Sequence, residues 1–371
     1  MEKPKLLMVG AFAPSERNVY GGLVTSCRAL VNSSFPQQFN LTLIDSTQVS
    51  NPPPGLLIRA LIAIRRFFLF VFKVCWTRPD AVLVFSTSGL GLLEKGVMGR
   101  FSQLVGARVL MFPRGGNLLR NYENSKLMRA CSSIAFKKAN KVLCQGKQWQ
   151  SFVTQKLRRR HEDAPIVENW TASKELLKIG SNRTYDRNEK TPLKILFVGW
   201  LDCEKGVMDI LRALSDFSGK GRFQIEFVGE GNVLNEAKDF VGENGLEKDV
   251  VFSGWLEGPA LCKAYQRSEV FLLPSWMEGL PNAMIEAMAA GLPPVVSSVG
   301  NIPSVIEDRK NGLLVEPKKP CSVSSALNRI MDNELLLEKL GKNAYEFARD
   351  NFSTEVAVKK LSSVIYEVLA V

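Results

Sequence analysis

Short apolar runs recur along this chain, and each is followed by a stretch long enough to form a helix. Runs of this kind are typical of strands buried on both faces, as in parallel sheets that helices cover. The chain has 371 residues, more than one hydrophobic core commonly supports. The pattern therefore predicts an α/β protein with two Rossmann-like, parallel-sheet domains that face an inter-domain cleft. The runs cover residues 6–9, 81–85, 109–112, 141–144, 195–198, 224–228, 270–273 and 295–296.

A polar stretch in the middle of the chain suggests where the domains separate. Residues 181–190 are almost all polar and precede the strand expected from residue 194. We predict an N-terminal domain over 1–175, a linker over 176–192 and a C-terminal domain over 193–354. A final helix is expected over 355–371, for which a return to the N-terminal domain stays open.

The two halves of the chain differ in charge. Residues 1–175 contain 25 Lys and Arg against 10 Asp and Glu, whereas the remainder contains 23 against 27. Such a surplus indicates that the first domain faces an anionic partner. The seven cysteines are dispersed, without a Cys-x-x-Cys pair. With the short apolar run at the start, they favour a reduced, cytoplasmic protein over a secreted one.

Residues 55–76 form the most unusual segment, because a strongly apolar helix pattern carries cations and no acid. Arg59, Arg66 and Lys73 are seven residues apart and fall on one stripe, with Arg65 beside them. Four cations make a membrane span too costly, at about 2.5–3.5 kcal/mol each. Two interpretations stay open: a helix lying in the interface of an anionic membrane, and a core helix whose cationic side chains extend to the surface.

Two glutamates eight residues apart follow the strand at 270–273. Glu278 lies in the loop at the carboxyl end of that strand, where ligands bind in open α/β sheets. Glu286 lies on an otherwise apolar helix over 283–290, with Asn282 expected as its N-cap. A lone carboxylate there needs partners, and the hydroxyl groups of a ligand are one possibility. A structural Glu–Lys pair is the alternative.

Two further segments fit an anionic ligand. Lys205 stands just before the helix expected from Val207, where a point charge and the helix dipole both favour a phosphate. Gly21 and Gly22 follow the first strand and open another helix, which alone is weak evidence for an anion site. Together with the two glutamates, these residues suggest a nucleotide diphosphate flanked by hydroxyl-rich groups.

The segment from Glu278 to Pro293 resembles the Glu-x7-Glu motif of retaining GT-B glycosyltransferases of family 4, the glycosyl transferases group 1. The likeness extends over about residues 194–366 and reaches the first domain only through the Gly21-Gly22 loop and the strand pattern. The resemblance implies a nucleotide-sugar-binding C-terminal domain and an acceptor-binding N-terminal domain. It implies that Glu278 binds the donor sugar near the reacting centre, that Glu286 binds the ribose and that Lys205 neutralises the leaving diphosphate. By the same resemblance, the donor also meets the backbone of Gly22, Leu256, Gly279, Leu280, Pro281, Asn282 and Ala283.

Two positions depart from the family pattern. Trp200 stands where the family usually has an arginine that contacts phosphate. Many members also carry a first-domain histidine near the donor sugar, whereas the one histidine here, His161, lies in a basic run near the expected linker. Arg114, directly after the strand at 109–112, is our candidate for the missing charge, and a surface arginine at a strand end is the alternative.

The resemblance predicts retaining transfer of a hexosyl or N-acetylhexosaminyl group from a nucleotide-diphosphate sugar, with UDP-sugars favoured and no further cofactor. Since no Asp-x-Asp sequence stands out, we expect no metal. The basic first domain favours a glycan or polyprenyl-linked acceptor at the cytoplasmic face of the plasma membrane, as in bacterial surface-polysaccharide synthesis. The alternatives are a nucleotide-sugar epimerase or a phosphorylase on the same fold, and a nucleic-acid-binding protein. No RNA-binding signature is visible, so we expect no nucleic acid among the partners.

Overall fold

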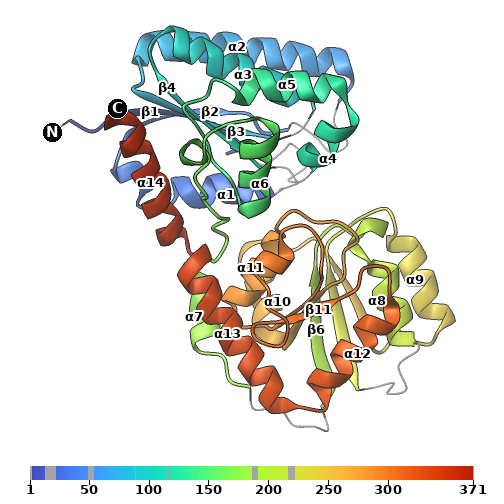
Figure 1. Ribbon diagram of the computed structural model, residues 1–371. Helices are drawn as coiled ribbons and strands as arrows, with labels where there is room; N and C mark the ends of the chain where they lie inside the picture. Colours follow the sequence, from blue (N-terminus) through green and yellow to red (C-terminus); the bar gives the residue numbers. More distant parts are fainter. Residues whose placement is uncertain are drawn as a thin grey trace. The chain divides into compact units, whose positions relative to one another are not determined.

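The computed structural model describes residues 2–12, 22–48, 54–87, 89–114, 117–185, 191–215 and 222–370 (Figure 1). The chain divides into two compact units. Unit 1 comprises Met1–Thr171 together with Thr354–Val371, and unit 2 comprises Ala172–Ser353. Each unit contains one parallel sheet, of five strands in unit 1 and six in unit 2. This confirms the predicted α/β class with two parallel-sheet domains.

The sheet of unit 1 has the order β2-β1-β3-β4-β5, and its strands pair in parallel. Its side chains alternate between two core clusters: Leu7 and Val9 of β1 face one cluster, and Leu6 and Met8 face the other. The strands are β1 (Lys5–Gly10), β2 (Asn40–Asp45), β3 (Ala81–Ser86), β4 (Arg108–Pro113) and β5 (Lys141–Val142).

Helices cover both faces of the unit 1 sheet. In Figure 1, α2, α3 and α5 lie over one face, and α1 and α14 lie over the other. The C-terminal helix α14 buries Leu361 and Ile365 in the second cluster, and its Lys360 Nζ lies 2.7 Å from Glu168 Oε2. The helices are α1 (Gly22–Val31), α2 (Leu56–Thr77), α3 (Leu90–Leu104), α4 (Asn117–Asn124), α5 (Lys126–Phe136), α6 (Lys147–Ser151) and α14 (Thr354–Ala370).

Helix α2 turns part of its apolar surface to the outside. Phe70 and Val74 are buried against unit 1, whereas nine large apolar side chains are exposed. The predicted cationic stripe does not face outward as a whole. Arg66 Nη1 pairs with Glu94 at 3.1 Å and Lys73 Nζ donates to the Leu43 carbonyl at 2.9 Å, because this side of α2 faces α3 and β2. Arg59 and Arg65 are exposed. The exposed apolar residues are Leu56, Leu57, Ile58, Leu61, Ile64, Phe68, Leu69, Phe72 and Trp76.

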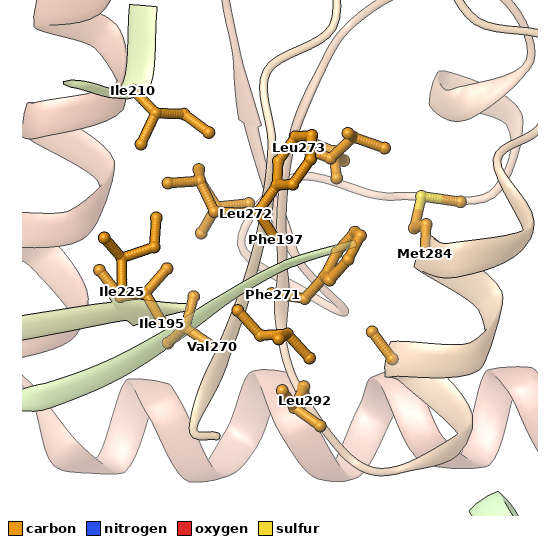
Figure 2. Packing of buried hydrophobic residues seen from close by; sticks show 14 of the residues in the cluster. Ile195, Phe197, Ile210, Ile225, Val270, Phe271, Leu272, Leu273, Met284 and Leu292 are labelled. Carbon is orange, nitrogen blue, oxygen red and sulfur yellow. The ribbon is translucent and has the colours of Figure 1, made fainter. Parts of the chain in front are cut away.

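The sheet of unit 2 has the order β11-β10-β9-β6-β7-β8, again with parallel pairing. Figure 2 shows the centre of its core, where Phe197 of β6 and Phe271 of β9 pack near Met284 of α11. The strands are β6 (Leu193–Val198), β7 (Phe223–Val228), β8 (Val250–Gly254), β9 (Val270–Leu273), β10 (Pro294–Ser297) and β11 (Leu313–Val315). The helices are α7 (Lys174–Ser181), α8 (Val207–Ser215), α9 (Leu234–Glu243), α10 (Gly258–Arg267), α11 (Asn282–Ala289), α12 (Pro320–Met331) and α13 (Glu334–Phe352).

The predicted linker over 176–192 is wrong in its described part. Unit 2 begins at Ala172, and most of α7 and the residues after it pack within that unit. Arg183 donates from Nη1 to the Ser268 carbonyl at 2.7 Å and from Nε to the Ala290 carbonyl at 2.6 Å. Tyr185 donates its hydroxyl hydrogen to the Gly291 carbonyl at 2.7 Å. Two of the polar residues that suggested a linker therefore donate to backbone carbonyls just after the C-terminal ends of α10 and α11. Residues 186–190 lie outside the described part.

Candidate functional site

The two loops that hold Lys205 and Glu278 leave neighbouring strands at the same edge of the unit 2 sheet. β6 and β9 pair in parallel, with Ile195 opposite Val270. β6 leads through the short 3-10 helix Cys203–Lys205 (η4) into α8, and β9 leads through residues 274–281 into α11. Because β6 is the first strand of the unit and has β9 on one side and β7 on the other, the chain reverses its direction across the sheet here. Open α/β sheets bind ligands at such a switch point.

Lys205 and Glu278 form an ion pair at this edge. Lys205 Nζ lies 2.5 Å from Glu278 Oε1, and Ser275 Oγ donates to the same oxygen at 2.9 Å. The Glu278 side chain is 9% exposed and the Lys205 side chain 27% exposed, so a ligand can reach the cation more easily than the acid. The structural Glu–Lys pair considered from the sequence thus exists, but it joins Lys205 to Glu278 and not to Glu286.

The close approach of the two loops depends on glycine at one position. Gly206 has φ +74°, a left-handed conformation that favours glycine. A Cβ at this position would overlap the carbonyl oxygen of Pro274. Gly206 therefore lets the start of α8 reach the loop that carries Glu278.

Glu286 has a different environment from Glu278. It is partly buried on α11, and its Oε2 accepts a hydrogen bond of 2.9 Å from the hydroxyl of Tyr265 on α10. Burial raises the pKa of Glu286 to about 7, although the bond from Tyr265 works in the opposite direction. Tyr265 is itself fully buried. Glu286 is therefore poised to change its ionisation near neutral pH, and a ligand hydroxyl that donates to it would favour the carboxylate.

The residues around the start of α11 are only partly accessible. Leu280 and Pro281 are buried, whereas Gly279, Asn282 and Ala283 are partly buried. α11 begins at Asn282, with Pro281 in the N-cap position, so the prediction that Asn282 is the N-cap is wrong. The Gly279 carbonyl accepts from the backbone N–H of Asn301 at 2.9 Å, which fixes this turn against the loop after β10.

Leu256 lies beside two tryptophans at the same edge of the sheet. It follows β8 and is partly buried. Its neighbour Trp255 packs against Trp200, which follows β6, with ring centroids 5.2 Å apart. Trp200, the departure from the family pattern, thus contributes an aromatic surface to this edge in place of a cation.

The predicted residues of unit 1 have other surroundings. Gly22 is exposed at the start of α1; residues 13–21 lie outside the described part. Arg114 follows β4, and its Nη2 donates to Ser26 Oγ at 2.8 Å. Its guanidinium lies 4.6 Å from the Trp170 ring centroid and 5.0 Å from that of Phe112. Burial lowers the pKa of Arg114 to about 10. These contacts give Arg114 a packing role in unit 1, and the roles of Arg114 and Gly22 toward a donor stay predictions.

Several residues of the site had no clear signal in the sequence. Ser275 stands three residues before Glu278, and its position in the same loop was a usable hint. Tyr265 lies on α10, 21 residues before Glu286, and nothing in the local pattern links the two. Among the described residues, no group of three His, Cys, Asp or Glu side chains is arranged to hold a metal ion.

A family model and several known proteins resemble parts of this chain. Residues 182–347 match the family model described as glycosyl transferases group 1. An uncharacterized glycosyltransferase, MJ1607, of Methanocaldococcus jannaschii is 33% identical over 43% of this chain and 43% of its own length. The amylovoran biosynthesis glycosyltransferase AmsK of Erwinia amylovora is 28% identical over 47% of this chain and 44% of its own. The matches thus span less than half of each of these two relatives.

Solved structures resemble the chain over nearly its whole length. Anabaena HepE, crystallised in complex with UDP-glucose, superposes with a TM-score of 0.71 at 14% identity, over 98% of this chain and 99% of its own. At this identity the likeness concerns the fold, which is GT-B. Most of unit 2 therefore resembles the glycosyl transferases group 1 family, and the chain has the GT-B fold.

Proposed function

We propose that this protein is a retaining glycosyltransferase of family 4, which moves a sugar from a nucleotide-diphosphate donor to a hydroxyl of a glycan or lipid-linked acceptor. The observation that carries the proposal is the ion pair of Lys205 and Glu278, 2.5 Å apart at the switch point of a unit that resembles the group 1 family. Glu286 stands eight residues further on, on the helix that follows the same loop.

In the proposed step, the bond between the sugar C1 and the diphosphate oxygen breaks. The acceptor hydroxyl oxygen forms its bond to C1 on the same face, and the hydroxyl proton passes to the departing phosphate oxygen. Lys205 neutralises that phosphate, Glu278 accepts hydrogen bonds from the sugar hydroxyls and Glu286 accepts them from the ribose. Fixed charges and dipoles of this kind stabilise a leaving group because they need no reorganisation during the reaction.

We favour UDP-sugars as donors. Support comes from Anabaena HepE, which shares the fold and was crystallised with UDP-glucose. Aromatic surfaces stack on nucleobases, and Trp200 and Trp255 supply such a surface beside Leu256. No cofactor beyond the donor enters the proposed step.

The test is a panel of UDP, GDP and ADP, measured by calorimetry and thermal unfolding. A nucleotide at 100 times its Kd stabilises the folded state by about 2.7 kcal/mol. We expect UDP to raise the unfolding temperature most, and Lys205→Met to weaken its binding at least tenfold. Lys248→Met, which removes an exposed lysine of the same unit, is the control and should bind UDP as the wild type does. Equal binding by both variants would contradict the proposed site.

The acceptor, in this proposal, is presented at the surface of an anionic membrane on the cytoplasmic side. Unit 1 contains 26 Lys and Arg against 11 Asp and Glu. On α2, nine large apolar side chains are exposed, Leu57 at 83% and Trp76 at 79%. No helix in the described part of the chain is long and apolar enough to span a bilayer. A helix with these features suits the interface, its apolar side chains among the acyl chains and Arg59 and Arg65 near the headgroups.

A role in assembling surface polysaccharides follows from this acceptor. The relative AmsK is named an amylovoran biosynthesis glycosyltransferase. Lipid-linked glycans at the inner face of the plasma membrane are the acceptors that combine a hydroxyl-rich end with a membrane anchor.

A further inference from the structure

Trp276 connects the two loops that hold Lys205 and Glu278. Its backbone N–H donates to the Glu204 carbonyl at 2.8 Å. Its indole Nε1 donates to Asp209 Oδ2 at 2.6 Å. Lys318, in the segment between β11 and α12, places its Nζ 4.5 Å from the centre of the Trp276 ring. Three segments that are distant in sequence therefore meet at one side chain.

Asp209 is well suited to anchor this tryptophan. It lies in the first turn of α8, and only 4% of its surface is exposed. A carboxylate buried to this extent requires hydrogen-bond donors, and the indole N–H is the closest one described. Arg212 is further away, at 3.7 Å, and its side chain is 54% exposed, so it screens the charge only weakly.

The residues that Trp276 contacts lie close to Lys205 in the sequence. Trp276 stands two residues before Glu278. Its partners Glu204 and Asp209 stand one residue before and four residues after Lys205. The bond from the Trp276 indole to Asp209 thus joins the same two short segments as the Lys205–Glu278 ion pair. Asp209 stands about one helical turn after Lys205. Lys205 ends a single 3-10 turn and Glu278 lies in a loop 73 positions away, so the length of their ion pair depends on contacts between the two segments.

We propose that Trp276 and Asp209 are positioning residues that fix the separation between the Lys205 ammonium and the Glu278 carboxylate. This inference rests on the proposed function, in which these two groups hold opposite ends of the transferred group. An error of about 1 Å in such a separation can cost about a hundredfold in rate. The Trp276–Asp209 bond therefore sets how well Lys205 meets the diphosphate while Glu278 holds the sugar.

A double-mutant cycle on UDP binding tests this coupling. UDP affinity is measured by calorimetry for the wild type, Lys205→Met, Trp276→Phe and the double variant. We expect Lys205→Met to weaken UDP binding at least tenfold in the wild-type background, but less than about threefold in the Trp276→Phe background. Residues that act through one another are non-additive in this way, whereas independent sites add. Asp209→Ala, which also removes the contact, takes the place of Trp276→Phe if that variant does not fold.

Two further variants separate positioning from general stability. Asp209→Asn keeps an acceptor oxygen for the indole, so we expect the Lys205→Met effect there to stay within about twofold of its wild-type size. Asp332→Asn removes an exposed acid of the same unit, which pairs with Arg222 at 3.2 Å. In this background Lys205→Met should weaken UDP binding as much as it does in the wild type. An equal loss from Lys205→Met in the wild-type and Trp276→Phe backgrounds would overturn the positioning role and leave the proposed function intact. No loss from Lys205→Met in the wild type would overturn the proposed function, and the positioning role with it.

Discussion

Among the residues of the candidate site, Glu286 has surroundings that bring its pKa close to neutral pH. Burial raises its pKa to about 7, against an ordinary value near 4.3 in an unfolded chain. The folded protein therefore holds this proton over a pH range in which the unfolded chain has released it. Stability that depends on this proton is fully present below about pH 4.3 and is lost as the pH rises through 7.

We predict that Glu286→Gln makes the stability of the protein less dependent on pH. The amide carries no charge, so the stability of the variant relative to the wild type should be about 1–3 kcal/mol higher at pH 8 than at pH 5. Urea unfolding at both values measures this difference. Glu247→Gln, at an exposed position of the same unit, should show no such dependence. If the difference in unfolding free energy between Glu286→Gln and the wild type were the same at pH 5 and pH 8, the raised pKa of Glu286 would be contradicted.

The sequence indicated where Lys205 and Glu278 stand relative to strands and helices, but not which groups they contact. The structure brings these two residues to 2.5 Å, whereas the sequence placed Glu278 only in the loop after a strand and Lys205 only at the start of a helix. It gave no sign of Tyr265 or Asp209, because hydrogen bonds to these side chains join elements with no common sequence pattern. Arg114 was predicted from its position after a strand. Its stacking on Trp170 depends on a residue 56 positions away, which no local pattern reveals.

At the scale of elements, strands were more predictable than polar connections. Buried parallel strands are continuous apolar runs, and the eight predicted runs correspond to eight strands of the two sheets. The strands without a predicted run, β2, β8 and β11, lie at sheet edges. The predicted linker failed because Arg183 and Tyr185 are polar residues that donate to carbonyls of a folded unit. Helix α2 was predicted as amphipathic, yet which of its cations face outward depends on packing against Glu94 and Leu43.

The exposed side chains of α2 lead to a prediction about membrane binding. Burying one large apolar side chain is worth about 1.5–3 kcal/mol, so Leu57→Glu with Phe68→Glu should reduce binding to anionic vesicles at least tenfold. Flotation with vesicles of phosphatidylglycerol and phosphatidylcholine measures this binding. Leu335→Glu alters a 77% exposed leucine of unit 2 and should float as the wild type does. Undiminished flotation of the α2 variant would show that another surface binds the membrane.

At the scale of the whole molecule, the two units carry net charges of opposite sign. Unit 1 is strongly basic, but unit 2 contains 22 Lys and Arg against 26 Asp and Glu. Unit 2 is nevertheless the unit proposed to bind a diphosphate. The positive charge must then come from local groups, and Trp200 adds none. Lys205 and the backbone amides at the start of α11 are two local sources of such charge at this edge.

A divalent cation is another possible source of positive charge. Removing metal ions distinguishes this source from the protein's own groups. We predict that EDTA leaves turnover of the donor within twofold of its untreated value, and that added Mg²⁺ does not restore Lys205→Met. The reason is that Lys205 forms a direct contact with the leaving phosphate in the proposed step, which a hydrated ion without carboxylate ligands cannot replace. Nucleotide release from the donor, measured with and without EDTA, tests both statements. Activity that EDTA abolishes and Mg²⁺ restores would assign the neutralising charge to a metal and leave Lys205 a structural partner of Glu278.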